Sequence, residues 1–378
     1  MKNKLNEIER SILQISRSIV LISIFFILII SICLSIIVVP KKAQNFAKPN
    51  LVKGINSDEL SLQPTEASQP IVAPKPNSEI TAILWEAPSE STIPKGLEGE
   101  EILYGKDLIA NTAQYLGPKG SVAAISNGMN CQNCHNDAGR KPWGNNYSAV
   151  YSTYPKFRAR SGTKETIVKR VNDCFERSLN GKPLDSATKE MKAIKAYLKW
   201  LGSDVKSGEK PAGVGLQKLA YLDRAADIGK GAAVYSAKCV SCHGKNGEGL
   251  LSPDKIVYTY PPLWGENSYN KGAGLFRISR FAGYIKYNMP LGATYDSPQL
   301  TDEESWDIAA YVESLDRPSK DLSADWPKIG KKPFDHPFGP FEDKYSEQQH
   351  KYGPFIAIKK EKKKREEAEE LLKKKEKK

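Results

Sequence analysis

Two stretches of sequence decide the fold of this chain: CQNCH at Cys131–His135 and CVSCH at Cys239–His243. In each, two cysteines are separated by two residues and followed directly by a histidine. C-x-x-C-H is the attachment motif of c-type haem, in which both thiols bond to the haem and the adjacent histidine ligates the iron. We therefore predict two covalently bound haem c groups. The attachment and proximal-ligand residues are Cys131, Cys134, His135, Cys239, Cys242 and His243.

Zinc binding and redox exchange are the other uses of paired cysteines. A structural zinc site needs four closed ligands at shorter spacings, and a redox pair does not need the histidine that follows both pairs. Six cysteines in 378 residues are also too few for a disulfide scaffold. Haem attachment is therefore the favoured interpretation of both motifs.

The sequence around the two motifs repeats. A plausible helix precedes each motif and an amphipathic helix closes each unit, which is the order found in small mono-haem cytochromes c. The four predicted helices lie at 99–116, 186–201, 225–237 and 301–315. We predict a mainly α fold with two tandem cytochrome c-type haem domains, at 84–205 and 221–317, joined by a linker at 206–220.

The ends of the chain differ from its middle. Residues 19–39 form an uncharged apolar run that spans about 31 Å as a helix. We expect an N-terminal transmembrane anchor there (or a signal peptide), preceded by a cytoplasmic N-terminus at 1–18 and followed by a Pro/Ser-rich linker at 40–83. We expect a C-terminal extension at 318–358 to pack on the haem domains, and a charged Lys/Glu tail at 359–378.

The net charge of +12 lies mostly in residues 1–42 and 359–378. It therefore says little about the folded part and does not indicate a nucleic-acid partner. Because haem is attached covalently outside the cytoplasm, residues 43–378 must be exported. The expected location is the periplasmic, extracytoplasmic face of the cytoplasmic membrane, with the N-terminal helix as the membrane contact.

The sixth ligand of each haem iron decides between electron transfer and chemistry. In the second unit the candidate is Met289, which precedes a proline in the loop before the closing helix. Lys286, three residues earlier, is a weaker alternative. The two histidines outside the motifs, His336 and His350, lie far downstream, which argues against bis-histidine ligation.

The first unit has no methionine at the corresponding place. Counted back from the closing helix, Cys174 occupies the register that Met289 has in the second unit. Met191 lies on the apolar face of its helix, which favours core packing, and Met129 is too close to the first motif to reach the other haem face. We therefore predict Cys174 as the sixth ligand, with a buried inert thiol or an intermolecular disulfide as the alternatives.

Basic residues surround Cys174 in the sequence. If residues 166–178 are helical, Arg170 and Arg177 share the face of Cys174. Guanidinium groups bind oxyanions, although a solvated basic helix face is the simpler interpretation of any one arginine. The basic residues are Arg158, Arg160, Lys164, Lys169, Arg170, Arg177 and Lys182.

The segment Val171–Lys182, VNDCFERSLNGK, resembles the dihaem cytochrome c thiosulfate dehydrogenases, a family also described as tetrathionate reductases. The resemblance covers roughly residues 84–356 and includes QQHKYGPF at 348–355. It implies that the first haem is the active site and that Arg160 and Arg170 are its arginines. The implied iron ligands are His135 and Cys174 for the first haem, and His243 with Met289 (or Lys286 in one redox state) for the second.

The resemblance implies an oxidoreductase that couples two thiosulfates into tetrathionate, or runs the reverse reduction. Arg160 and Arg170 would hold the dianion beside Cys174, and electrons would pass through the second haem to an external cytochrome or oxidase. Two other functions stay open: a membrane-anchored dihaem electron carrier without a substrate, and a thiosulfate-conjugating subunit of a sulfur-oxidation complex. A dihaem peroxidase is a weak option because no suitable switching histidine lies between the motifs.

Overall fold

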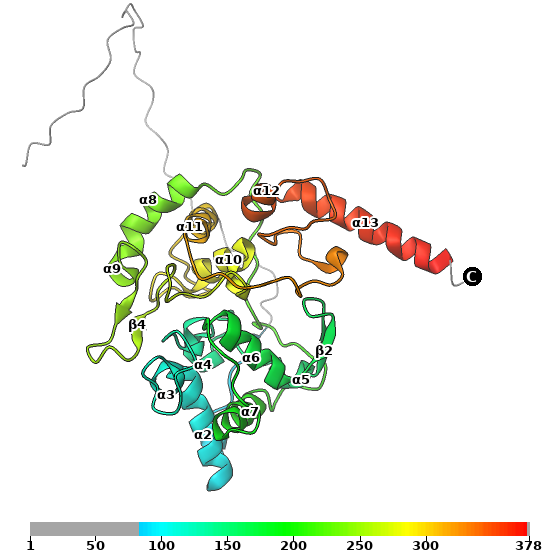
Figure 1. The fold of residues 1–378 in the computed structure, drawn as a ribbon. Coiled ribbons are helices and arrows are strands. Elements are labelled where there is room, and N and C mark those ends of the chain that lie inside the picture. The colour runs from blue at the N-terminus through cyan, green and yellow to red at the C-terminus, as the bar shows by residue number, and fades with distance from the viewer. Residues whose placement is uncertain (1–82, 376–378) are drawn as a thin grey trace, which may run out of the picture. The chain divides into compact units, whose positions relative to one another are not determined.

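The computed structural model describes residues 83–375, and these are mainly helical. The elements of the first haem unit and those of the second gather in separate halves of this region (Figure 1). The mainly α fold with two haem-motif units therefore agrees with the prediction from sequence. The predicted domain boundaries stay predictions.

The predicted fold class needs one correction, which concerns the transmembrane helix. Within residues 83–375, no helix combines the length and the apolar character needed to cross a membrane. The run at 19–39 on which that prediction was based lies outside the described residues, as do the N-terminus at 1–18 and almost all of the linker at 40–83. The architecture found is two helical haem-motif units, without a membrane-spanning helix in the part that the structure describes.

The first unit is built on two crossing helices, α2 (Leu97–Ala110) and α7 (Lys189–Leu201). The helix predicted at 99–116 is interrupted at Asn111, after which α3 (Thr112–Leu116) begins. The remaining elements are short, apart from the helix that carries Cys174. They are η1 (Glu90–Thr92), η2 (Cys131–Asn133), α4 (Asn136–Gly139), α5 (Val150–Thr153), the antiparallel pair β1 (Lys156–Arg158) and β2 (Thr163–Glu165), and α6 (Ile167–Arg177).

The second unit repeats this plan with α8 (Ile228–Lys238) against α11 (Asp302–Ser314). The predicted capping box is present, because Thr301 accepts from the backbone N–H of Glu304 and Glu304 accepts from that of Thr301. The other elements are α9 (Val240–His243), the antiparallel pair β3 (Leu250–Leu251) and β4 (Tyr258–Tyr260), η3 (Gly274–Phe276) and α10 (Ile278–Asn288).

A glycine at the same place in both units permits the close crossing of the two main helices. A Cβ atom on Gly105 would lie 2.0 Å from the carbonyl oxygen of Ala193, and one on Gly231 would lie 1.9 Å from that of Asp307. Any side chain here would force the helices apart. The match shows that the internal repeat in the sequence is a repeat of helix packing.

Residues after the second unit pack on both units. Arg177 of α6 donates to both carboxylate oxygens of Asp325 at 2.8 Å, and Arg277 of the second unit pairs with buried Asp335. These contacts join the C-terminal segment to both haem units. The elements of this segment are η4 (Ile329–Lys331), α12 (Glu347–Tyr352) and α13 (Ile356–Lys375).

Candidate functional site

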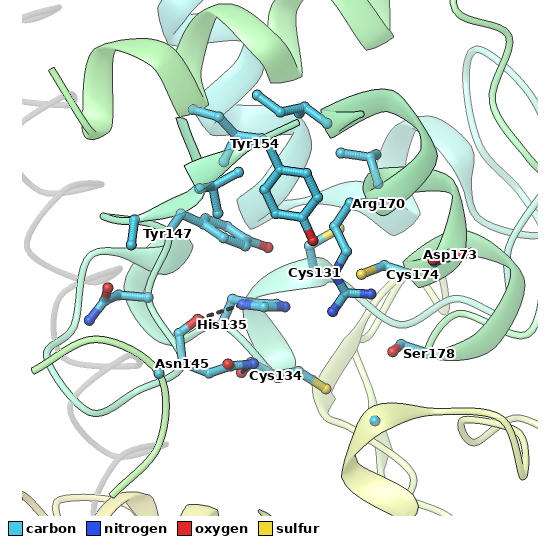
Figure 2. Close-up of a pocket in the computed structure, with 18 of the residues that line it drawn as sticks. Cys131, Cys134, His135, Asn145, Tyr147, Tyr154, Arg170, Asp173, Cys174 and Ser178 are labelled. Atoms are coloured by element: carbon cyan, nitrogen blue, oxygen red, sulfur yellow. Dashed lines mark hydrogen bonds between the residues drawn. The ribbon is translucent and has the colours of Figure 1, made fainter. Parts of the chain in front are cut away.

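A cavity of about 480 Å³ lies beside the first haem motif, lined by Cys131, Cys134 and His135 on one side and by Cys174 on another. Figure 2 shows the His135 ring, the Cys174 sulfur and the Arg170 guanidinium directed into the same space. The structure thus brings together the motif and the cysteine predicted to face it. These residues lie far apart in the sequence and on different elements.

His135 is arranged as a metal ligand would be. Its Nδ1 contacts the backbone carbonyl oxygen of Asn145 at 2.5 Å, and the ring of Tyr147 stacks on the imidazole with centroids 4.3 Å apart (Figure 2). Burial lowers the pKa of His135 to about 4, so the imidazole is neutral at physiological pH. A carbonyl on Nδ1 fixes the tautomer that leaves Nε2 free for iron. The residues present therefore fit a haem held by this motif.

Helix α6 brings Cys174 to the cavity. Phe175 and Asp173 are buried, and Thr166 caps the helix by accepting from the backbone N–H of Lys169. Arg170, one turn before Cys174, lies on the same face as the sequence spacing requires. The nearby sulfur of Cys174 raises the pKa of Arg170, so this guanidinium stays charged beside the cysteine.

The charged residues that line this first cavity are almost all basic. Asp173 is its one acidic residue in the part of the chain that the structure describes. Such a concentration of positive charge favours an anionic occupant. The basic residues are Lys156, Arg158, Arg160, Arg170, Arg177, Lys210, Arg277 and Arg280.

Arg160 lines the first cavity but is held more firmly than Arg170. Its Nη1 donates to the carbonyl oxygen of Gly272 at 3.2 Å, its Nε lies 4.0 Å from a carboxylate oxygen of Asp325, and its guanidinium lies 5.7 Å from the ring centroid of Trp326. Burial and neighbouring arginines lower the pKa of Arg160 to about 10. The structure therefore places both predicted arginines in the cavity, with Arg170 the freer of the two.

A second cavity, of about 120 Å³, lies beside the second haem motif and is lined by Cys239, Cys242, His243 and Met289. The Nδ1 of His243 contacts the carbonyl oxygen of Pro261 at 2.9 Å, which is the arrangement found at His135. Burial lowers the pKa of His243. This donor set also fits a haem, with the thioether of Met289 lining the second cavity as the sulfur of Cys174 lines the first.

Lys286, the alternative sixth ligand, does not line the second cavity. Its Nζ donates to the carbonyl oxygen of Leu300 at 2.6 Å and lies 2.8 Å from a carboxylate oxygen of Asp302. The two histidines outside the motifs also have other partners. His350 contacts Asp343 and the Phe334 carbonyl, and His336 contacts the Phe338 carbonyl.

The two cavities adjoin, since Cys134 and Leu275 line both of them. Sequence reasoning missed the residues of the second unit and of the C-terminal segment that complete the first cavity, among them Arg280, Arg277 and Trp326. No local pattern marks them, because only the packing of the two units brings them to Cys174.

Comparison with known families agrees with this arrangement. Residues 228–316 match the cytochrome c family, and residues 121–206 match the family described as the SoxA/TsdA cytochrome c domain. The fold and the two sites thus define a c-type cytochrome with two cytochrome c domains, whose cofactor is haem c.

The chain is similar to several curated thiosulfate dehydrogenases. That of Allochromatium vinosum is 37% identical over 235 residues, which are 61% of this chain and 83% of the relative. That of Thiomonas intermedia is 35% identical over 257 residues, 67% of this chain and 78% of the relative. The chain therefore belongs to the thiosulfate dehydrogenase family, a family of oxidoreductases.

A solved structure of thiosulfate dehydrogenase (TsdBA) from Marichromatium purpuratum, in its as-isolated form, has a similar fold. The TM-score is 0.58 at 31% sequence identity, over 66% of this chain. This chain spans about half of that solved chain, 51% of its length.

Proposed function

We propose that this protein is a dihaem enzyme that oxidises two thiosulfate ions to one tetrathionate ion and releases two electrons. The observation that carries the proposal is Cys174 facing His135 across a cavity whose charged lining residues are basic, apart from Asp173. An electron carrier without a substrate has no need to gather so much buried positive charge.

The residues of the first cavity perform binding and orientation. Thiosulfate is a dianion, and the guanidinium of Arg170 offers paired N–H donors to its oxygens beside Cys174. Arg160, tethered to Gly272 and Asp325, provides a second, fixed positive charge. A haem bound to Cys131 and Cys134 would supply one-electron redox chemistry at this place.

The second cavity is suited to electron transfer. We propose His243 and Met289 as the iron ligands there, since both line the cavity while Lys286 is bound to Leu300 and Asp302. Because Cys134 lines both cavities, the two sites adjoin, which favours electron transfer between them. Electrons would leave from the second site to an external cytochrome or oxidase. The reverse reaction, tetrathionate reduction, uses the same residues.

An extracytoplasmic location accompanies the proposal, because covalent haem attachment takes place outside the cytoplasm. It is supported by the two C-x-x-C-H motifs and by the match to cytochrome c families. Fractionation of cells that express the chain would test it: the haem-stained protein is expected outside the cytoplasmic fraction, and haem-loaded protein inside it would contradict the proposal.

The decisive experiment measures tetrathionate formation by the purified, haem-loaded chain with ferricyanide as electron acceptor. Wild type is expected to form tetrathionate, and Cys174→Ala is expected to lose this activity while retaining haem. Ser236→Ala, an exposed change on α8, is the control and should match wild type. Equal rates in the Cys174 variant and wild type, or no product in wild type, would refute the proposal.

The second candidate function is a thiosulfate-conjugating subunit of a sulfur-oxidation complex, and the match of residues 121–206 to a family described as SoxA/TsdA favours it. Such a subunit would consume thiosulfate only in the presence of a carrier protein. The same assay distinguishes the two functions, because it contains no carrier: free tetrathionate formed there supports the dehydrogenase and excludes the conjugating subunit.

A further inference from the structure

Helix α10 of the second unit reaches both cavities. Its face at four-residue spacing carries Arg280, Tyr284 and Asn288. Tyr284 donates through its hydroxyl to the carbonyl oxygen of Asn133 at 2.7 Å, and Asn288 accepts from the side-chain amide of Asn136 at 2.9 Å. These bonds dock that face of α10 on the first haem motif, and Arg280 lines the first cavity.

The arginines that line the first cavity differ in their partners. Four of them lie within 4.0 Å of a carboxylate oxygen: Arg158 with Glu165, Arg160 and Arg177 with Asp325, and Arg277 with Asp335. Within residues 83–375, Arg170 and Arg280 have no such carboxylate. Arg170 is already assigned to the anion by the proposed function. Arg280 is the second guanidinium left for an occupant of the cavity.

The surroundings of Arg280 make a bound anion favourable. Its side chain is exposed to the cavity, yet desolvation by the surrounding protein lowers its pKa, and the positive charges of Arg277, Arg158 and Arg170 add to this effect. The carboxylate of Asp335 acts against this lowering of the pKa, but its oxygens are already bound to Arg277 and Ser279. An arginine stays charged under these conditions, so an oxyanion that pairs with it would relieve both the desolvation and the repulsion.

We propose that Arg280 binds an oxyanion in the first cavity, which Arg170 also lines, so that both haem units build one active site. Two oxyanions share this chemistry: the sulfonate end of thiosulfate and a carboxylate of the haem. Binding of thiosulfate by Arg280 rests on the proposed function, whereas binding of a haem carboxylate does not.

The test compares haem-loaded full-length wild type, Arg280→Gln and Arg280→Lys. Lys230→Gln is the control, since it removes one positive charge from the exposed surface of α8 in the same unit. Three quantities are measured: kcat and KM for thiosulfate, the Kd of sulfate as a non-reacting oxyanion by calorimetry, and the midpoint potential of each haem.

If Arg280 binds substrate, Arg280→Gln should raise the KM for thiosulfate and the Kd of sulfate by roughly tenfold or more, the scale of a lost charged hydrogen bond. The haem potentials should match those of wild type. If Arg280 binds a haem carboxylate, the potential of one haem should shift while KM and Kd stay within about twofold. Either result supports the proposal and identifies the anion.

The proposal is overturned if Arg280→Gln equals Lys230→Gln in KM, in sulfate Kd and in both potentials. Should the glutamine variant not be recovered with haem, Arg280→Lys decides: a lysine cannot form the paired hydrogen bonds, so unchanged values in all three measurements would contradict the role. A wild type that binds sulfate but forms no tetrathionate would refute the proposed function, and sulfate binding and potentials would still decide the role of Arg280.

Discussion

The two cytochrome c domains share one scaffold and differ in what surrounds the haem motif. In both, a glycine permits the helix crossing and the motif histidine contacts a backbone carbonyl oxygen through Nδ1. The first cavity, however, has Cys174 and eight basic residues, whereas the second has Met289 and, among the described residues, a single charged one, Lys238.

This difference separates the residues that form the common scaffold of the two domains from the residues that serve the reaction in the first cavity. Buried charge is costly and is retained only where it has a partner. In the first cavity four arginines have carboxylate partners, and for the other two residues 83–375 provide none within 4.0 Å, so the cavity is prepared for an anion. The largely apolar second cavity has no such requirement and suits a site that only passes electrons.

Replacing the ligand of the first cavity with that of the second should have the largest effect. In Cys174→Met, we expect haem to stay attached through Cys131 and Cys134 while tetrathionate formation falls by roughly 10³-fold or more, the scale seen when one member of a catalytic unit is removed. The measurement is kcat with ferricyanide as acceptor. Activity within tenfold of wild type would show that the cysteine does not distinguish the two domains.

The scaffold could be predicted from the sequence because its signals are local. The C-x-x-C-H motifs, the capping box at Thr301 and the helical period around Cys174 each depend on a few neighbouring residues. The register of Cys174 against Met289 came from the repeat itself. The interruption of α2 at Asn111 was missed, although Thr112 there donates to the carbonyl oxygen of Leu108 and accepts from the N–H of Cys131.

The completion of the first cavity could not be predicted, because it depends on contacts between distant segments. Arg280 and Asp325 lie in the second unit and the C-terminal segment, and nothing in their local sequence points to Cys174. The packing of α10 on the first motif depends on Tyr284 and Asn288 finding Asn133 and Asn136. Only a three-dimensional arrangement reveals such pairings.

The contact of the C-terminal segment with the first cavity gives the second prediction. Asp325→Asn removes the carboxylate charge that holds Arg177 and lies near Arg160, and both arginines are largely buried. Breaking a buried pair leaves an uncompensated charge and should lower the free energy of unfolding by about 3 kcal/mol. Denaturant unfolding measures this, with exposed Asp296→Asn as the control. Equal stability of the two variants would contradict the prediction.

The shared helix crossing gives the third prediction, in which the two domains should respond alike. Gly105→Ala and Gly231→Ala each place a Cβ atom against a carbonyl oxygen and should destabilise by about 1–3 kcal/mol. Gly229→Ala on the same helix as Gly231 approaches only the carboxylate of Asp227 that caps α8, at 3.3 Å, and should destabilise less than either crossing variant. Thermal unfolding measures all three. A neutral result at only one of the two crossings would show that the domains do not share this packing.

The charge difference between the cavities gives the smallest effect and the last prediction. Lys156 and Lys210 line the first cavity, and Lys210 is exposed, so both should attract thiosulfate from solution. In the double variant Lys156→Gln/Lys210→Gln, we expect kcat/KM to fall by about threefold at low ionic strength and to converge with wild type at high salt, where screening removes long-range attraction. The matched variant Lys230→Gln/Lys245→Gln removes the same charge from exposed positions in the second domain, outside the lining of both cavities. If this control variant lowers kcat/KM as much as the Lys156/Lys210 variant does, the net charge of the protein sets kcat/KM. If the control variant matches wild type, the attraction comes from the lysines of the first cavity.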